Sequence, residues 1–416
     1  MGFMEKTKIA IWGTGADGRA FYQKVKALCD VICFFDNVPK CNMIDGLPVV
    51  TWETGRKYSN KCDIIVIATS KFCKEIANQL DGYGLIYSKN YCIHGMPWVR
   101  DLIPVIVNYR LMRCVCTHSQ MMDYLRWLKC YKKVAIVYGN CQTSILQKML
   151  VTSESFSSRY TILAIPSVFD YQTTEDLALL DEDYWSLCDL FITQNVSEDN
   201  RYSPYLSTNR LLSKLPDCCT TVVIPNVFFR GYWPQVIRNE HNIEQDKHQS
   251  GKWPYGDVCL ETIVRGGGTV EGAVDEVLQE KFLSRERVLD NAEKSLMELE
   301  KRERTCDVMI SDYIRKHYRD QQMFFSENHP CNQLLSVLLK RVFKKLGWQF
   351  DVDINKLSGD DTLKGQDVPI YPSVIKALGL KKYERKYYPN RYLWSGCFEI
   401  KEFLLKYIDD CIRYGS

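Results

Sequence analysis

The chain repeats one local pattern, in which a short β-branched and apolar run is followed by a polar or glycine-rich turn and then by a helical pattern. The predicted strands are Lys8–Trp12, Val31–Phe35, Asp63–Thr69, Val134–Tyr138, Tyr160–Ile165, Leu187–Thr193 and Thr220–Ile224. Strands that alternate with helical stretches form parallel sheets, because a parallel connection needs a long crossover. We therefore predict an α/β protein with two parallel-sheet domains.

The first turn, Gly13-Thr14-Gly15-Ala16-Asp17-Gly18, has the spacing of a dinucleotide-binding loop. The first glycine permits the tight turn, the second lets a phosphate approach the backbone, and the third lets helix and strand pack closely. Asp36 ends the next strand, where a carboxylate can bond a ribose hydroxyl. Gly13, Gly15, Gly18 and Asp36 are thus the predicted binding residues for a nucleotide or NAD(P).

Residues 8–94 resemble the small Rossmann-like domain attached to bacterial sugar-nucleotide and polysaccharide-biosynthesis proteins, where the domain often has no redox role. The chain has no Tyr-x-x-x-Lys pair after this segment of the kind that a sugar epimerase or reductase uses. Two interpretations stay open: nucleotide binding, and a scaffold or regulatory domain without a ligand. A nicotinamide-dependent sugar oxidoreductase is a third hypothesis, and it lacks a visible catalytic pair.

The stretch Lys132–Leu150 carries the turn Gly139-Asn140-Cys141-Gln142 between a buried strand and a helix. Open α/β sheets bind ligands at the carboxyl ends of their strands. A thiol at a helix N-terminus lies where the helix dipole favours a thiolate or another anion. We interpret the turn as an active-site or acyl-donor-binding turn; the alternative is a buried structural cysteine.

Later segments add polar groups in matching positions. The strand ends carry Gln194-Asn195 and Pro225-Asn226, and His329 lies before a proline and a helix, a suitable setting for a general base. The aromatic segment Phe228–Gln235 contains Arg230, which either binds a phosphate or packs as a loop arginine.

The order of nucleophile, asparagine and His-Pro resembles SGNH-type hydrolases and acyltransferases, with Gly139-Asn140-Cys141 in place of Gly-Asp-Ser. Ser326 stands where the triad acid is expected, and Glu327 is one residue away. Residues 132–347 resemble the WcbI-like polysaccharide-biosynthesis family more closely. The matching motifs are Gly139-Asn140-Cys141-Gln142, Phe229-Arg230-Gly231-Tyr232, Gly256-Asp257 and Asn328-His329-Pro330.

This resemblance implies an SGNH-like α/β domain, binding of coenzyme A or acetyl-CoA, and acetyl transfer to a sugar hydroxyl in capsule or surface polysaccharide assembly. The implied catalytic residues are Cys141, His329, Asn140, Gln142 and Asn195. The implied cofactor-binding residues are Gly139, Arg230 and Tyr232. An SGNH-type esterase and a non-catalytic glycan-assembly protein that binds a nucleotide or nucleotide-sugar are the alternatives. The expected partners are a glycan or sugar-nucleotide substrate and other enzymes of the pathway, and the sequence leaves open whether the chain forms an oligomer.

Composition narrows the class of protein further. A net charge of +3 gives no reason to expect a nucleic acid or membrane partner, and no apolar run reaches the length of a membrane span. The 18 cysteines are scattered without a paired CxxC spacing, which predicts reduced thiols, no metal site and a cytoplasmic protein.

We predict four segments: a Rossmann-like domain over 1–95, a helical linker over 96–131, the WcbI/SGNH-like domain over 132–350, and a helical C-terminal extension over 351–416. Within these, Val274–Gln322 is predicted as one long helix or a helical pair, and Glu399–Arg413 as an amphipathic helix.

Overall fold

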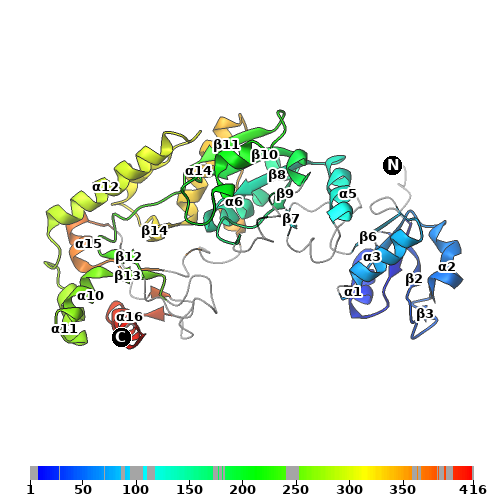
Figure 1. Ribbon diagram of the computed structural model, residues 1–416, viewed down its shortest axis with the longest axis horizontal. Helices are drawn as coiled ribbons and strands as arrows, with labels where there is room; N and C mark the ends of the chain where they lie inside the picture. Colours follow the sequence, from blue (N-terminus) through cyan, green and yellow to red (C-terminus); the bar gives the residue numbers. More distant parts are fainter. Residues whose placement is uncertain are drawn as a thin grey trace. The chain divides into compact units, whose positions relative to one another are not determined.

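The fold is mixed α/β with parallel sheets and many helices, which confirms the predicted class (Figure 1). The computed structural model describes residues 8–27, 29–69, 71–85, 90–93, 106–109, 118–171, 177, 180, 183–239, 253–357, 363, 367–381, 383, 388–389 and 397–414. The chain forms two compact units. The first comprises 1–138, 156–191 and 209–221, and the second comprises 139–155, 192–208 and 222–416.

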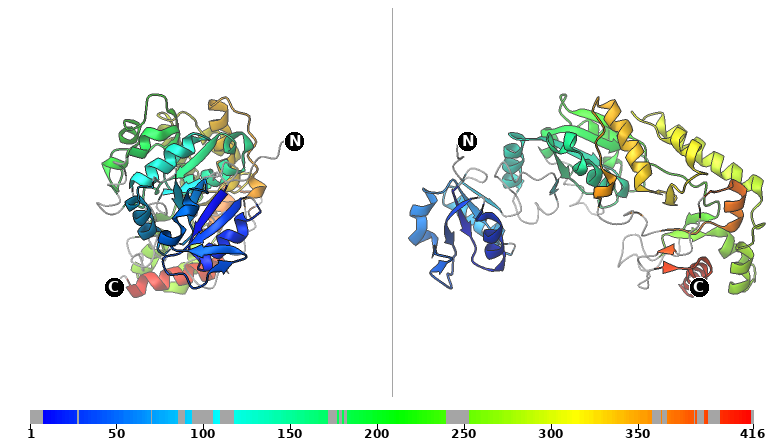
Figure 2. Two further views of the ribbon diagram at one scale, coloured as in Figure 1. Left: turned by 90° about the vertical axis from the view of Figure 1, so that its right-hand side faces the viewer. Right: turned by 180° about the vertical axis from the view of Figure 1, so that it is seen from behind.

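The N-terminal part of the first unit is a six-stranded sheet in the order β3-β4-β2-β1-β5-β6, whose strands lie side by side in Figure 2. All pairs of neighbouring strands in this sheet are parallel except β3 with β4. Its elements are β1 (Lys8–Trp12), α1 (Ala16–Val25), β2 (Asp30–Phe35), β3 (Met43–Ile44), β4 (Leu47–Val50), α2 (Trp52–Ser59), β5 (Ile64–Ile67), α3 (Cys73–Gly82) and β6 (Tyr91–Ile93). The chain leaves β1 toward β2 and later returns to the other side of β1 at β5, so a topological switch point lies between β1 and β5.

The glycine turn after β1 lies at this switch point. Gly13 has φ +121°, a conformation that favours glycine, and a Cβ there would lie 3.1 Å from the Ala68 carbonyl oxygen. A Cβ at Gly18 would lie only 2.0 Å from the Gly13 carbonyl oxygen, so the third glycine permits the close approach of helix α1 to the strand end. By contrast, a Cβ at Gly15 would meet no heavy atom within 4 Å.

A second sheet has five strands in the order β11-β10-β8-β9-β7. Its elements and their connections are β7 (Ile106–Asn108), α5 (His118–Lys129), β8 (Lys133–Tyr138), α6 (Cys141–Thr152), α7 (Glu154–Ser157), β9 (Tyr160–Ala164), the 3₁₀ helix η3 (Asp183–Leu187), β10 (Cys188–Gln194), η4 (Pro204–Leu206), α9 (Thr208–Leu212) and β11 (Thr220–Ile224). Strand β8 is central, with β9 on one side and β10 on the other, so this sheet also has a switch point beside its first central strand.

The linker predicted as purely helical over 96–131 is wrong at β7, which pairs parallel with β9 and forms an edge of the second sheet. Only three residues form this strand, too few to show a period in the sequence. Helix α5 agrees with the helical prediction for the end of the same segment. The sequence also predicts a helix over Thr173–Leu180, and most of this stretch lies outside the described residues.

The rest of the second unit is mainly helical. Its elements are β12 (Val236–Arg238), β13 (Tyr255–Asp257), α10 (Val258–Arg265), α11 (Val270–Val277), α12 (Arg285–Glu303), α13 (Ser311–His317), β14 (Phe324–Ser326), β15 (His329–Pro330), α14 (Asn332–Lys345), η5 (Ile354–Lys356), α15 (Pro372–Leu378), β16 (Tyr388–Pro389), β17 (Cys397–Phe398) and α16 (Ile400–Tyr414). Helix α16 follows the amphipathic helix predicted at the end of the chain. None of the described helices has both the length and the apolar character to cross a membrane.

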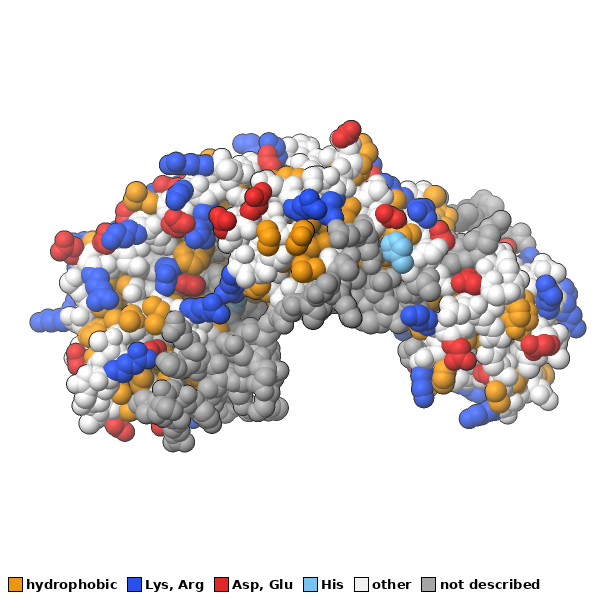
Figure 3. Space-filling view, viewed as in Figure 1, with side chains coloured by type: hydrophobic (Ala, Val, Ile, Leu, Met, Phe, Trp, Pro, Cys, Tyr) orange, Lys and Arg blue, Asp and Glu red, His pale blue; other side chains and the backbone are white. Residues whose placement is uncertain are grey.

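The charged stretch 274–322 forms three helices, α11, α12 and α13, rather than one helix or a pair. Ser284 ends the intervening turn and caps α12 by accepting a hydrogen bond from the Arg287 N–H. Acidic and basic side chains are intermixed over the region of α12 in Figure 3. Ion pairs such as Arg302–Glu298 at 2.8 Å and Arg315–Glu293 at 2.7 Å account for this mixture, as expected of a solvated helix face.

We predict that Gly18→Ala destabilises the first sheet by about 2 kcal/mol or more, because the new methyl group must displace the backbone at Gly13. Gly82→Ala is the matched control, since a Cβ at Gly82 would meet nothing within 4 Å. Hydrogen exchange of peptides from β1, α1 and β5 measures the effect locally. Equal protection in the two variants would contradict the prediction.

Candidate active site

The turn between β8 and α6 is closed by a glycine and an asparagine cap. Gly139 has φ +152°, and a Cβ on it would lie 2.3 Å from Oε1 of Gln194, so only glycine fits the turn. Asn140 is the N-cap of α6, where its Oδ1 accepts a hydrogen bond of 3.0 Å from the Gln142 N–H. Cys141 is therefore the first residue of a twelve-residue helix, and it is half-buried.

The side-chain amide of Gln142 is the centre of the hydrogen-bond network at this turn. Its Nε2 donates to the carbonyl oxygens of Val227 and Asn328, both at 2.8 Å, and to Oδ1 of Asn226 at 3.2 Å. Its Oε1 accepts from Gln194 Nε2 at 2.9 Å and from the Val227 N–H at 3.1 Å. Gln142 is fully buried, so these bonds replace all the hydration of its amide.

The ends of β10 and β11 supply the other amides of this network. Gln194, the last residue of β10, accepts a hydrogen bond of 2.8 Å from the Asn140 N–H through its Oε1. Asn226 follows β11, and its Oδ1 accepts from Asn140 Nδ2 at 3.0 Å. The predicted gathering of strand-end polar groups therefore occurs here, beside the switch point of the second sheet.

The segment that carries His329 joins the same network through its backbone. His329 lies in β15, which forms a short antiparallel hairpin with β14 in which Ser326 faces His329. The Asn328 carbonyl oxygen accepts the 2.8 Å bond from Gln142 Nε2. Cys141 and His329 are therefore each one residue away from the two ends of a single hydrogen bond that spans 186 positions of the sequence.

Tyr255 forms a wall beside the histidine. Its hydroxyl donates to Asn328 Oδ1 at 2.7 Å and accepts from Ser326 Oγ at 2.8 Å. Its ring meets the His329 ring edge-on, with 6.4 Å between the ring centres. His329 is 9% exposed, which places the imidazole in a largely desolvated position where its interactions with charge are strengthened.

The carboxylate of Glu327 pairs with an arginine. Arg230 Nε lies 3.0 Å from Glu327 Oε2, and the Arg230 Nη2 also donates to the Val236 carbonyl oxygen. Burial raises the pKa of Glu327, and the positive charges of Arg230 and Arg302 oppose this shift. The Phe229 N–H donates to the Glu327 carbonyl oxygen at 2.7 Å, so the arginine segment and the histidine segment are fixed to each other.

Two of the predicted site residues have side chains bound elsewhere. Asn195 Nδ2 donates to Thr305 Oγ1 at 2.7 Å, and its neighbour Gln194 is the amide that bonds the cysteine turn. Tyr232 is fully buried, and its hydroxyl donates to the carbonyl oxygens of Tyr318 and Gln321. The oxyanion role of Asn195 and the cofactor role of Tyr232 stay predictions, and these contacts give both residues a structural role.

The predicted nucleotide-binding residues of the first sheet also lie together. Asp36 accepts hydrogen bonds from both the N–H and the hydroxyl of Thr14 in the glycine turn, and its Oδ1 accepts from the Val38 N–H at 2.9 Å. Its carboxylate thus closes the loop, and a ribose hydroxyl would have to share it. The open space above Gly15 is the feature that a phosphate would use.

Sequence reasoning missed Gln194, Asn226 and Tyr255 as site residues. The first two were visible as polar residues at strand ends, but the choice between Gln194 and Asn195 depends on which one points toward β8, and strand alternation reverses with a shift of one residue. Tyr255 is 73 positions from its partner Asn328, and no local pattern connects them.

The part of the chain that forms most of the second sheet and the candidate site is similar to known proteins. A family described as "Polysaccharide biosynthesis enzyme WcbI" matches residues 134–351. A solved structure of WcbI, titled a novel polysaccharide biosynthesis enzyme, is similar with a TM-score of 0.57 and 22% identity over 68% of this chain and 90% of that one. That structure is described as the native protein without a disulfide bond between CoA and one of the cysteines of WcbI. No curated protein matches the chain.

We predict that Gln142→Leu destabilises the second unit by about 4 kcal/mol or more, because it leaves buried donors and acceptors without partners. Lys148→Leu is the matched control on the same helix, where the exposed side chain predicts a change within about 0.5 kcal/mol. Urea denaturation measures both. Similar midpoints for the two variants would contradict a central role for Gln142.

A second prediction concerns Asp257, whose pKa is raised to about 6 by burial, against hydrogen bonds from the Leu260 N–H and the Tyr371 hydroxyl. The folded state then holds a proton that the unfolded state, with a pKa of 3.8, has released. Stability should fall as pH rises through this window, by about 2 to 3 kcal/mol between pH 4 and pH 7.

Asp257→Asn removes this titration and keeps an oxygen that can accept from Leu260. Urea denaturation of both proteins between about pH 4 and pH 7 should show the variant gaining stability relative to the natural chain as pH rises. A constant difference between the two proteins would show that Asp257 does not titrate in this range.

Proposed function

Because this chain belongs to the WcbI family of polysaccharide biosynthesis enzymes, we propose that it transfers an acyl group from coenzyme A to a sugar hydroxyl during capsule or surface polysaccharide synthesis. The similar solved structure supports the choice of donor, because it is described as native WcbI without a disulfide bond between CoA and one of its cysteines. In this chain, Cys141 is the half-buried cysteine at the start of α6. The SGNH-like arrangement expected for the domain is part of the same proposal.

The observation that carries the proposal is the hydrogen bond from Gln142 Nε2 to the Asn328 carbonyl oxygen. It holds the residue after Cys141 against the residue before His329. An acyl transferase needs a base close to the place where the thioester carbonyl lies. A buried network that links these two segments supports such a placement, because it fixes the backbone next to each of the two reactive side chains.

The proposed reaction requires a proton transfer and the cleavage of one thioester bond. His329 takes the proton of the sugar hydroxyl, whose oxygen attacks the thioester carbonyl carbon. The carbon–sulfur bond then breaks, and the CoA sulfur receives the proton from His329. The N-terminus of α6 favours negative charge on the carbonyl oxygen in the transition state, where one well-placed donor is worth about 3 kcal/mol.

Cys141 gives a second route to the same products. The Cys141 thiol gives its proton to His329 and attacks the thioester, and CoA leaves as a thiol after taking that proton. The sugar hydroxyl then gives its proton to His329 and attacks the Cys141 thioester, whose carbon–sulfur bond breaks as the Cys141 sulfur takes the proton back. In both routes Gln142 is a positioning residue, because both ends of its amide are bonded within the protein. Asn140 likewise positions the turn through Asn226 and the helix cap.

Coenzyme A fits this site best at its thiol end. Cys141 is the first residue of α6, so the thiol end of CoA would meet the helix N-terminus, which favours a thiolate. Arg230 is 39% exposed and would bind a phosphate only while sharing its guanidinium with Glu327. A nucleotide or NAD(P) in the Rossmann-like first domain, held over Gly13, Gly15 and Gly18, is a separate proposal that rests on the open Gly15 turn.

The test uses the full chain with acetyl-CoA and a panel of sugar acceptors. We expect CoA to bind in calorimetry, and His329→Gln to lower transfer by about 100-fold or more while CoA still binds. Cys141→Ala separates the two routes, because it abolishes turnover only if the acyl group passes through the sulfur. Cys130→Ala is the control, since this exposed cysteine lies outside the proposed machinery.

Other outcomes identify the alternatives. Release of acetate without an acceptor, lost in His329→Gln, would indicate an SGNH-type esterase. Binding of CoA without transfer to any acceptor, and without an effect of either variant on hydrolysis, would indicate a non-catalytic assembly protein. Absence of CoA binding would overturn the proposed donor.

A further inference from the structure

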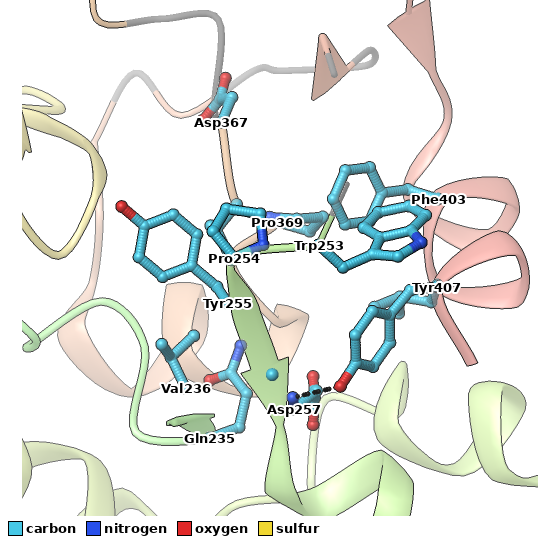
Figure 4. Close-up of a pocket in the computed structure, with 13 residues that line it drawn as sticks. Gln235, Val236, Trp253, Pro254, Tyr255, Asp257, Asp367, Pro369, Phe403 and Tyr407 are labelled. Carbon is cyan, nitrogen blue, oxygen red and sulfur yellow. Dashed lines mark hydrogen bonds between the residues drawn. The ribbon is translucent and has the colours of Figure 1, made fainter. Parts of the chain in front are cut away.

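An apolar pocket lies beside the candidate site and takes no part in the reaction described above. It opens between strand β13, the start of α16 and the segment 367–369, with about 530 Å³ of space including its mouth (Figure 4). The lining is mainly aromatic, aliphatic and proline side chains, among them Trp253, Pro254, Val368, Pro369, Phe403 and Leu404.

One wall of the pocket is shared with the histidine site. Tyr255 lines the pocket, and the same side chain bonds Asn328 and meets the His329 ring edge-on. A group attached to a carbonyl carbon near His329 would pass Tyr255 to reach the pocket. Figure 4 shows the Tyr255 ring at the pocket edge, opposite Trp253 and Phe403.

The charge of the lining excludes the polar end of coenzyme A. None of the residues that line the pocket in the described part of the chain is Lys, Arg or His, and two are Asp. Asp257 is bonded by the Tyr371 hydroxyl and the Leu260 N–H, so it serves the protein and not a ligand. Phosphates would be repelled here, whereas a hydrocarbon chain would lose water on all sides.

One buried polar group in the pocket offers a hydrogen-bond acceptor to a ligand. Gln235 is 1% exposed and lines the pocket, and its Oε1 is buried without a hydrogen-bond donor from any described residue. A buried acceptor left without a donor costs about 1 to 3 kcal/mol. A hydroxyl on the bound molecule would satisfy it.

We propose that this pocket binds the hydrocarbon chain of an acyl group longer than acetyl, and that Gln235 accepts a hydrogen bond from a hydroxyl on that chain. The inference rests on the proposed acyl transfer and names its substrate class: the donor is a medium-chain, hydroxylated acyl thioester. The thioester carbonyl lies at the Cys141 and His329 side, and the chain passes Tyr255 into the apolar lining.

The test uses S-acyl-N-acetylcysteamine thioesters, which carry the acyl group without the nucleotide. Calorimetry compares acetyl, octanoyl, 3-hydroxyoctanoyl and 8-hydroxyoctanoyl compounds on the full chain. Each buried methylene is worth about fourfold in affinity, so we expect octanoyl to bind at least about 30-fold more tightly than acetyl. At least one hydroxylated chain should bind more tightly than octanoyl.

Two variants make the result specific to the pocket. Val368→Trp fills it, and should remove the difference between octanoyl and acetyl; a general folding defect would instead weaken both compounds together. Gln235→Leu keeps the apolar volume and should keep the chain-length effect, while the preference for the hydroxylated chain disappears. Because Oε1 loses no protein donor, this variant should also unfold at the same or a higher temperature.

The outcomes separate this inference from the proposed function. If CoA binds and acetyl transfer occurs while acetyl and octanoyl compounds bind equally, the pocket proposal is overturned and the transferase stands. If the octanoyl compound binds tightly and CoA does not, the pocket holds an acyl chain and the proposed donor is wrong. If neither hydroxylated chain is preferred, the role given to Gln235 is wrong.

Discussion

The geometry of the candidate site depends on one buried amide, the side chain of Gln142. Four separate parts of the second unit meet at it: the turn after β8, the end of β10, the segment after β11 and the histidine hairpin. A buried amide is stabilising only when both of its ends are bonded, so each partner has to stay in place for the others to be satisfied. This mutual dependence fixes the backbone next to Cys141 and next to His329.

Much of this arrangement was accessible from the sequence. The run Val134–Tyr138 followed by Gly139 predicted a strand and a tight turn, and the structure has both. The polar strand ends also gather as predicted, because parallel strands bring their carboxyl ends to one edge. What the sequence could not decide was which amide of the pair Gln194-Asn195 faces the turn, since a shift of one residue reverses the face of a strand. The strand β7 was too short to give any signal.

The interpretation of charged and aromatic residues was less secure for a different reason. The sequence offers Arg230 as a phosphate ligand or as a loop arginine. Its partner Glu327 is 97 positions away, and the sequence marks it only as a neighbour of the expected triad acid. Long-range pairs of this kind have no periodicity to reveal them. The same applies to Tyr232, whose hydroxyl bonds to backbone oxygens of the turn after α13. A motif shows that residues occur together, and only packing shows whether a side chain faces a ligand or the core.

Both sheets have a topological switch point, but the polar residues at the two switch points do different things. In the first, the Asp36 carboxylate accepts two hydrogen bonds from Thr14, so the carboxylate that a nucleotide would use also stabilises the glycine turn. In the second, the amides hold the turn that carries Cys141 and the segment that carries His329. A fixed turn matters for an acyl transferase, because the chemistry needs a fixed backbone, a positive helix end and a base, while the hydrocarbon part of the acyl group needs only an apolar surface. Tyr255 is where the two requirements meet: its hydroxyl belongs to the polar network and its ring belongs to the apolar pocket. A substrate that used both sides at once would be selected by its chain and activated by the network, so that residues remote from the reaction would decide which acyl group is transferred.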